Sequence, residues 1–125
     1  MRELLLISAA GAAGALVRYA LSDWIAELTG ARFPWSTIAI NVVGCFLFGL
    51  IMHLTSIPEN WRLIACTGFL GAMTTFSTFS YETIRELEKG SFSMAFANVL
   101  LSVFVGITAG WLGIVLARQL VHTSA

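Results

Sequence analysis

Charge is the scarcest property of this 125-residue chain: charged side chains make up 11% of it, with seven basic, seven acidic and a formal net charge of zero. Soluble domains carry roughly 25% charged residues, so the composition excludes an ordinary soluble domain. The balanced charge gives no basic footprint for nucleic acid, and no nucleic-acid partner is expected. With 58% hydrophobic residues and a mean hydropathy of +0.84, the composition predicts a membrane protein.

Cysteine and proline are also rare, with two of each. Cys45 and Cys66 lie in apolar runs with no cluster of cysteine and histidine nearby, so they are interpreted as small buried groups rather than as a disulfide or a metal site. Pro34 and Pro58 mark helix boundaries. The sequence contains no hydrolytic motif and no ATP-binding motif, so we do not expect an enzyme.

Four apolar runs follow one another along a single domain of residues 1–125, at about residues 4–24, 35–54, 61–87 and 92–120. Each run supplies the roughly 20 apolar residues that span a bilayer as a helix. Trp24, Trp35 and Trp61 fall at the ends of runs, as interfacial aromatic residues do. The sequence therefore predicts an all-α membrane protein with four transmembrane helices.

The basic residues divide almost evenly between the two sides of the membrane that four spans would define. The side with both termini and the middle loop holds Arg2, Arg62 and Arg118. The other side holds Arg32, Arg85 and Lys89, with Arg18 near the end of the first span. The positive-inside rule thus gives no clear orientation. Either one arginine dominates and the orientation is single, or copies insert both ways and pair antiparallel.

Small residues at helical spacing predict close helix packing. Gly11 and Gly14 lie in an alanine-rich stretch of the first span, and Gly106 and Gly110 form a GxxxG spacing in the fourth. Four short helices leave little interior for a pathway, so a homodimer is the simplest assembly.

Polar residues are costly in a membrane, and their positions are therefore informative. In the second span one helical face carries Thr37, Asn41, Gly44 and Phe48. Asn41 either makes an interhelical hydrogen bond or directs its amide donors at an anion. A weaker stripe in the fourth span contains Asn98, Ser102 and Gly106.

The third span is unusual because residues 67–80 contain two glycines, six hydroxyl groups and three phenyl rings. A helix break near Gly71 to Thr74 would free carbonyl oxygens for a cation, as in transporters. The alternative is an intact helix in which the glycines serve packing.

Phe76 and Phe79 share a face just beyond this point. The edge of a phenyl ring is electropositive and can face an anion without the strong binding of a fixed charge. Glu82 follows one turn later, either as a charge at headgroup level or as part of a pathway.

Three groups of residues resemble the fluoride channels of the Fluc/CrcB type. They are Gly14-Ala15-x-x-Arg18-Tyr19, Asn41-x-x-Gly44 and the long string Thr67-Gly68-Phe69-Leu70-Gly71-x-x-Thr74-Thr75-Phe76-Ser77-Thr78-Phe79. The resemblance covers essentially the whole chain. Ala72 stands where many members have glycine, and Asn98 occupies a position where the family pattern is loose.

The resemblance implies a fluoride-selective passive channel that exports fluoride from the cytoplasm across the bacterial plasma (inner) membrane. It also implies an antiparallel, dual-topology homodimer with a broken third helix and two pores. A structural Na⁺ at the dimer centre would be bound by the backbone carbonyls of Gly71 and Thr74. The implied fluoride pathway contains Arg18, Thr37, Asn41, Phe76, Ser77, Thr78, Phe79, Glu82 and Ser102.

Two other functions remain open at this point. A small dual-topology drug/proton exchanger has a similar size, but it needs a carboxylate at the membrane centre, and the first span has no acid between Glu3 and Asp23. A non-conducting membrane scaffold would use the glycines and hydroxyl groups for packing alone. The combination of Asn41 with Phe76 and Phe79 favours a pathway. No role is assigned to His53.

Overall fold

The computed structural model describes residues 1–30 and 32–123, and this part of the chain is helical with no strand. The elements are α1 (Arg2–Thr29), α2 (Trp35–His53), α3 (Glu59–Leu63), η1 (Ile64–Leu70), α4 (Gly71–Met73), α5 (Phe76–Glu88), α6 (Phe92–Leu100), η2 (Leu101–Val105) and α7 (Gly106–Thr123). In η1 and η2 the hydrogen bonds join residues five apart, a π-helical geometry that widens the turn.

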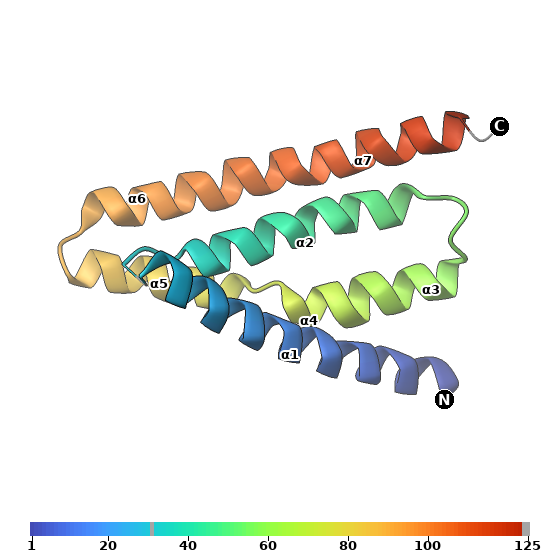
Figure 1. The fold of residues 1–125 in the computed structure, drawn as a ribbon, viewed down its shortest axis with the longest axis horizontal. Coiled ribbons are helices and arrows are strands. Elements are labelled where there is room, and N and C mark those ends of the chain that lie inside the picture. The colour runs from blue at the N-terminus through green and yellow to red at the C-terminus, as the bar shows by residue number, and fades with distance from the viewer. Residues whose placement is uncertain (31, 124–125) are drawn as a thin grey trace.

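Four helical segments are long and apolar enough to cross a membrane: Arg2–Thr29, Trp35–His53, Glu59–Glu88 and Phe92–Thr123. This confirms the prediction of an all-helical chain with four candidate spans. Figure 1 shows the chain running back and forth, so that both ends of the chain and the α2–α3 connection lie at one end of the molecule. The α1–α2 and α5–α6 connections lie at the other.

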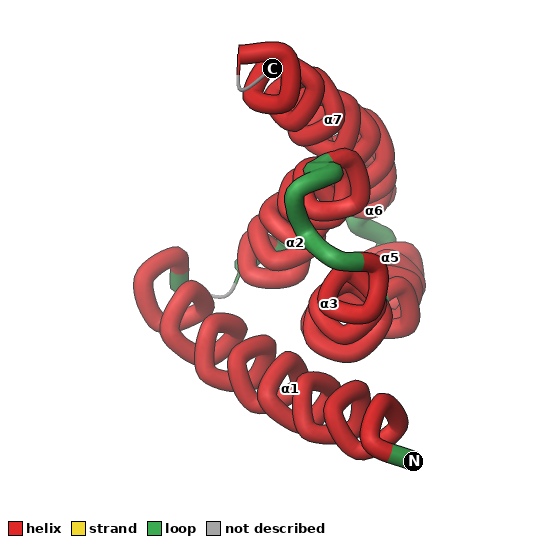
Figure 2. Tube along the Cα trace, turned by 90° about the vertical axis from the view of Figure 1, so that its right-hand side faces the viewer, coloured by secondary structure: helices red, strands yellow, loops and turns green. Residues whose placement is uncertain are grey.

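Helix α2 lies at the centre of the bundle and packs along α7, while α1 lies against η1 and α4 (Figures 1 and 2). Glycine permits these contacts. A Cβ atom on Gly49 would overlap the Gly110 carbonyl, and a Cβ on Gly14 would overlap the carbonyl of Phe69. Backbones therefore touch directly across both interfaces, as the glycine spacing predicted.

The apolar core lies between α2 and the first half of the third span. Ile40, Cys66, Leu70 and Met73 are buried together there. Gly30 and Gly90, both with φ of 75°, follow the ends of α1 and α5 in the left-handed conformation that glycine adopts without strain. Each glycine thus lets the chain leave its helix without backbone strain.

The third span contains two consecutive residues with extended backbone. Thr74 has φ −78° and ψ 156°, and Thr75 has φ −149° and ψ 120°. Helix α4 ends just before them and α5 begins just after them. Because these two residues are not helical, the N–H and carbonyl of Thr75 can bond a neighbouring helix.

Candidate functional site

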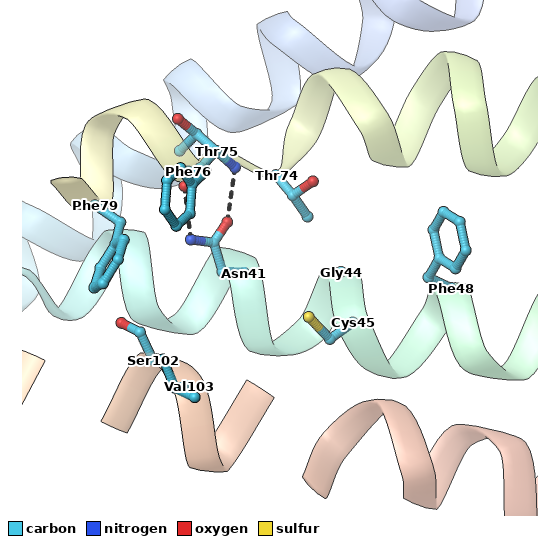
Figure 3. Close-up of a pocket in the computed structure, with 10 residues that line it drawn as sticks. All are labelled: Asn41, Gly44, Cys45, Phe48, Thr74, Thr75, Phe76, Phe79, Ser102 and Val103. Atoms are coloured by element: carbon cyan, nitrogen blue, oxygen red, sulfur yellow. Dashed lines mark hydrogen bonds between the residues drawn. The ribbon is translucent and has the colours of Figure 1, made fainter. Parts of the chain in front are cut away.

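A cavity of about 310 Å³ lies beside α2 and is lined by residues of the α4–α5 connection, α5 and η2 (Figure 3). Its lining residues are Asn41, Gly44, Cys45, Phe48, Thr74, Thr75, Phe76, Phe79, Ser102 and Val103. Four residues that the resemblance assigned to a fluoride pathway, Asn41, Phe76, Phe79 and Ser102, thus line one cavity. None of its ten described lining residues carries a charge.

The side chain of Asn41 binds the backbone of Thr75 through both ends of its amide (Figure 3). Its Nδ2 donates to the Thr75 carbonyl at 2.9 Å, and the Thr75 N–H donates to Oδ1 at 2.8 Å. The interhelical hydrogen bond expected as one alternative is therefore present. An amide nitrogen carries a second N–H, so Asn41 can hold the α4–α5 connection and still offer a donor to the cavity.

This pairing also determines which carbonyl groups lose their helical partners. In a continuous α-helix, the Thr75 N–H would bond the Gly71 carbonyl, and the Thr78 N–H would bond the Thr74 carbonyl. Here the Thr75 N–H donates to Asn41, and the Thr78 N–H donates to the Thr75 hydroxyl at 3.1 Å. The Gly71 and Thr74 carbonyls, which the resemblance named as cation ligands, are thus without these donors.

Thr75 begins α5 as its N-cap, because its hydroxyl accepts the Thr78 N–H. The same hydroxyl lies 3.0 Å from the Thr78 hydroxyl and 3.3 Å from that of Ser77. Ser77 and Thr78 therefore gather around Thr75 and are not among the residues that line the cavity. This capping role was not predicted from the sequence, although a threonine before a helical segment is a known signal for a helix start.

Phe76 and Phe79 form a tilted pair at the cavity, with ring centroids 5.5 Å apart and an interplanar angle of 49°. Phe76 is 79% exposed within the single chain, whereas Phe79 is partly buried. Both rings lie on the side of α2 that carries Asn41 (Figure 3). The pair brings aromatic surface, ring edges included, next to the amide.

Thr37 and Glu82 lie outside this cavity and bind one another. The buried Thr37 hydroxyl donates to Glu82 Oε1 at 2.8 Å, and Glu82 Oε2 is buried without a hydrogen-bond partner among the described residues. Glu82 also lines a second cavity of about 240 Å³ at the end of α5. That cavity contains the cationic side chains of Arg32, Arg85 and Lys89 together with Glu86.

A third cavity of about 220 Å³ lies toward the other end of α2 and shares Phe48 with the first. Arg62 lines it, donates to the Met52 carbonyl at 3.2 Å, and has a buried Nε with no partner in the described chain. Charged groups thus line these two cavities toward opposite ends of α2, and uncharged groups line the cavity between them.

Arg18 is the predicted pathway residue that the structure leaves apart from the others. It lies on α1, lines none of the cavities described above, and makes no hydrogen bond or ion pair within residues 1–30 and 32–123. His53 faces its own helix, with Nδ1 3.1 Å from the Gly49 carbonyl. The described residues contain no cluster of three or more His, Cys, Asp or Glu side chains for a metal. Backbone carbonyls remain as candidate cation ligands.

Comparison with known proteins agrees with these observations. Residues 5–114 match the family described as CrcB-like protein, Camphor Resistance (CrcB). The chain is 49% identical over 124 residues to a protein of Geobacter metallireducens named Fluoride-specific ion channel FluC, covering 96% of this chain and 100% of the relative. A protein of Geotalea uraniireducens with the same name is 48% identical, with the same coverage. This chain therefore belongs to the CrcB family.

Proposed function

We propose that this protein is a passive, fluoride-selective channel that exports fluoride from the cytoplasm across the bacterial plasma (inner) membrane and so relieves fluoride toxicity. The observation that carries the proposal is the uncharged cavity in which Asn41, Phe76, Phe79 and Ser102 meet inside the membrane-spanning bundle. Relatives that are 44–49% identical carry the name Fluoride-specific ion channel FluC.

The chemistry of this cavity suits a small, strongly hydrated anion. Fluoride leaves water only if close donors replace its hydration shell. The free N–H of Asn41, the Ser102 hydroxyl and the ring edges of Phe76 and Phe79 supply neutral donors. An ion must bind well enough to enter and weakly enough to leave, so a cavity without lysine or arginine favours conduction over trapping.

The charged cavities at the two ends serve entry and exit in this proposal. Arg62 at one end, and Arg32 and Arg85 at the other, attract anions toward the bundle. Glu82 lines the second cavity, and Thr37, which donates to Glu82, lies one turn along α2 from Asn41 in the uncharged cavity. Arg18 would then act from α1 at a vestibule that a single chain does not enclose.

We further propose that the interruption at Thr74 and Thr75 is a functional helix break that holds a structural Na⁺. The Gly71 and Thr74 carbonyls lack the amide donors of a continuous helix, which fits a hard cation that takes oxygen ligands. Two oxygens are few for a cation. Gly71 is exposed, so a second copy can approach and contribute its own pair.

A second copy in antiparallel, dual-topology arrangement would complete this cation site. The almost even distribution of basic residues supports insertion in both orientations. The exposure of Phe76, an aromatic side chain that lines the cavity, also supports a surface that another copy covers.

A liposome experiment tests the channel directly. Purified protein is reconstituted in vesicles loaded with fluoride, and efflux is followed with a fluoride electrode. We expect fluoride efflux far faster than from protein-free vesicles and slow chloride efflux under the same gradient. Efflux at the protein-free rate would reject the channel, and a scaffold would remain. Efflux that requires a proton gradient would favour an exchanger.

Replacing sodium tests the cation site. Substituting Na⁺ by the bulky organic cation N-methylglucamine during purification should lower the thermal stability of the dimer and reduce efflux, and readdition of Na⁺ should restore both. Unchanged stability and efflux after prolonged dialysis would reject the Na⁺ proposal without affecting the fluoride proposal.

Single-cysteine labelling tests the orientation. In a variant that lacks both native thiols, a cysteine introduced at Arg32 should react with a membrane-impermeant reagent from both sides of intact membranes. Labelling from one side alone would contradict dual topology.

A further inference from the structure

Asn98 is one of the most completely buried polar residues of the chain, with 0% of its surface exposed. It does not line the cavity, but it lies one turn before Ser102, which does. A buried amide is stable only if its polar atoms have partners. Its partners therefore show what Asn98 does.

The hydrogen bonds around Asn98 form a chain with one direction. The Ser102 hydroxyl lies 3.3 Å from Asn98 Oδ1, and Asn98 Nδ2 lies 2.9 Å from the Thr83 hydroxyl. Thr83 donates to the Phe79 carbonyl at 2.8 Å. A hydroxyl has one proton, so Thr83, having donated it, can only accept from Asn98. The amide nitrogen must face Thr83, and the amide oxygen must face Ser102.

This direction has a consequence for the cavity. Because Asn98 presents an oxygen, the single proton of Ser102 points toward Asn98 and away from any anion. The Ser102 oxygen then has only lone pairs left for the cavity, and lone pairs repel an anion. An anion at Ser102 must compete with Asn98 Oδ1 for the same proton.

An anion in the cavity competes only with a long hydrogen bond. The separation of 3.3 Å between Ser102 and Asn98 exceeds the usual 2.5–3.0 Å of an O–H···O hydrogen bond, so the proton is weakly held. The amide itself is fixed more firmly, by the shorter bond to Thr83 and by complete burial.

We propose that Asn98 is a positioning residue whose amide oxygen accepts the Ser102 proton while the cavity is empty. Ser102 then donates to the cavity only while an anion occupies it. Asn98 thereby weakens the resting affinity of the cavity and favours release of the ion. The proposal rests on the proposed function as an anion channel and assigns a role to a residue outside the cavity itself.

The first test is the concentration dependence of fluoride efflux in Asn98→Ala. Without the competing oxygen, the Ser102 hydroxyl is free to donate, and the fluoride concentration that gives half-maximal efflux should fall roughly two- to tenfold, the range of one hydrogen bond. The maximal rate should fall with it because the ion leaves more slowly. Ser102→Ala should raise the half-maximal concentration.

The double variant separates positioning from a merely structural role. If Asn98 acts through Ser102, Asn98→Ala combined with Ser102→Ala should behave as Ser102→Ala alone. Additive effects would overturn the proposal. It would also be overturned if Asn98→Ala left the half-maximal concentration unchanged, as happens if Ser102 then bonds the backbone carbonyl four residues earlier.

A second pair of variants covers the case in which Asn98→Ala does not assemble. Thr83→Val is close in shape and removes the acceptor of Asn98 Nδ2, so the amide is no longer held with its oxygen toward Ser102. The serine proton is released whenever the amide turns its N–H toward Ser102. The half-maximal concentration should again fall, whereas Thr83→Ser should match the wild type. Equal values for the valine and serine variants would overturn the proposal. Thr108→Ala is the control, since among the described residues that exposed hydroxyl bonds only the Phe104 carbonyl.

A binding measurement distinguishes failure of this proposal from failure of the channel. In detergent, sodium fluoride should raise the unfolding temperature of Asn98→Ala more than that of the wild type, with sodium chloride as reference, and should raise that of Ser102→Ala less. If this order holds while wild-type vesicles show no efflux, the channel proposal fails but the effect of Asn98 on anion binding at Ser102 stands. The reverse order would reject the role of Asn98.

Discussion

Helix α2 makes two kinds of contact, and the difference between them separates packing from function. Toward α7 it packs backbone to backbone, with Gly49 against the Gly110 carbonyl and Gly113 against that of Phe46. Toward the third span it makes polar contacts, from Asn41 to Thr75 and from Thr37 to Glu82. A cavity adjoins the polar contacts.

Small residues and polar residues therefore have different roles in the same helix: the glycines allow close packing, and the polar side chains form hydrogen bonds beside a cavity. Glycine at the α7 side brings backbones together and leaves no space. Asn41 on the other side holds a stretch of extended backbone and leaves room beside it. The α7 side should therefore respond to added volume, and the polar side to altered hydrogen bonding or charge.

The largest expected effect is loss of the folded protein in Gly49→Val. The new side chain would overlap the Gly110 carbonyl and crowd Ile114, and backbone cannot move aside as a flexible side chain can. We expect destabilisation of about 3 kcal/mol or more, seen as aggregation or a much lower unfolding temperature in detergent. Gly106→Ala is the control, because its Cβ would lie 3.7 Å from the Cys45 sulfur. Equal stability of the two variants would contradict tight packing at α7.

Asn41→Asp should reduce fluoride efflux from vesicles by about tenfold or more, a cost of about 1.4 kcal/mol or more to the passage of the ion. The carboxylate still accepts the Thr75 N–H but cannot donate to the Thr75 carbonyl, and it places negative charge in an uncharged cavity. Asn60→Asp makes the same chemical change at an exposed site on α3 and should conduct normally. Wild-type efflux in Asn41→Asp would remove this residue from the pathway.

Phe76→Ile should slow efflux several-fold while the assembly persists on size-exclusion chromatography. Isoleucine retains apolar bulk but has no electropositive ring edge, and aromatic geometry contributes about 0.5–1.5 kcal/mol. Phe104→Ile changes another exposed ring, one that lines no part of the central cavity. Equal rates for the two variants would show that only bulk matters at Phe76.

The smallest effect is expected for Thr75→Val, which removes the N-cap of α5 while preserving shape. Loss of a cap costs about 1 kcal/mol, so the unfolding temperature should fall by a few degrees. Thr75→Ser keeps the hydroxyl and should match the wild type. If both variants unfold at the wild-type temperature, the bond from the Thr78 N–H carries no stability.

The sequence predicted the four spans and the polar face of α2 because both depend on local regularities. A scarcity of charge marks the spans, and a helical period places Thr37, Asn41, Gly44 and Phe48 on one face. The last three of these line the cavity, and Thr37 does not. The partner of Asn41 could not be predicted in the same way. Its hydrogen bond to Thr75 joins residues 34 apart, and spacing within one helix says nothing about the neighbouring helix.

Other parts of the site depended on contacts that a one-dimensional pattern does not contain. The hydroxyls of Ser77 and Thr78 form hydrogen bonds with the hydroxyl of Thr75, so these polar groups lie together at the N-terminus of α5. Cys45 of α2 and Val103 of η2 line the cavity although they are apolar. Which residues line a cavity depends on how neighbouring helices are placed, not on polarity. The placement of Arg18 in a pathway stays a prediction, since a single chain does not test it.

Cys45 has a practical consequence for experiments that attach chemical labels to this protein. Both native thiols border cavities, Cys45 the uncharged one and Cys66 the one that contains Arg62. Serine, the usual replacement, would add a strong hydroxyl donor at Cys45, in the one region where extra donors should change ion binding. Alanine at both positions is therefore the background in which labelling and transport can be compared without altering the chemistry being measured.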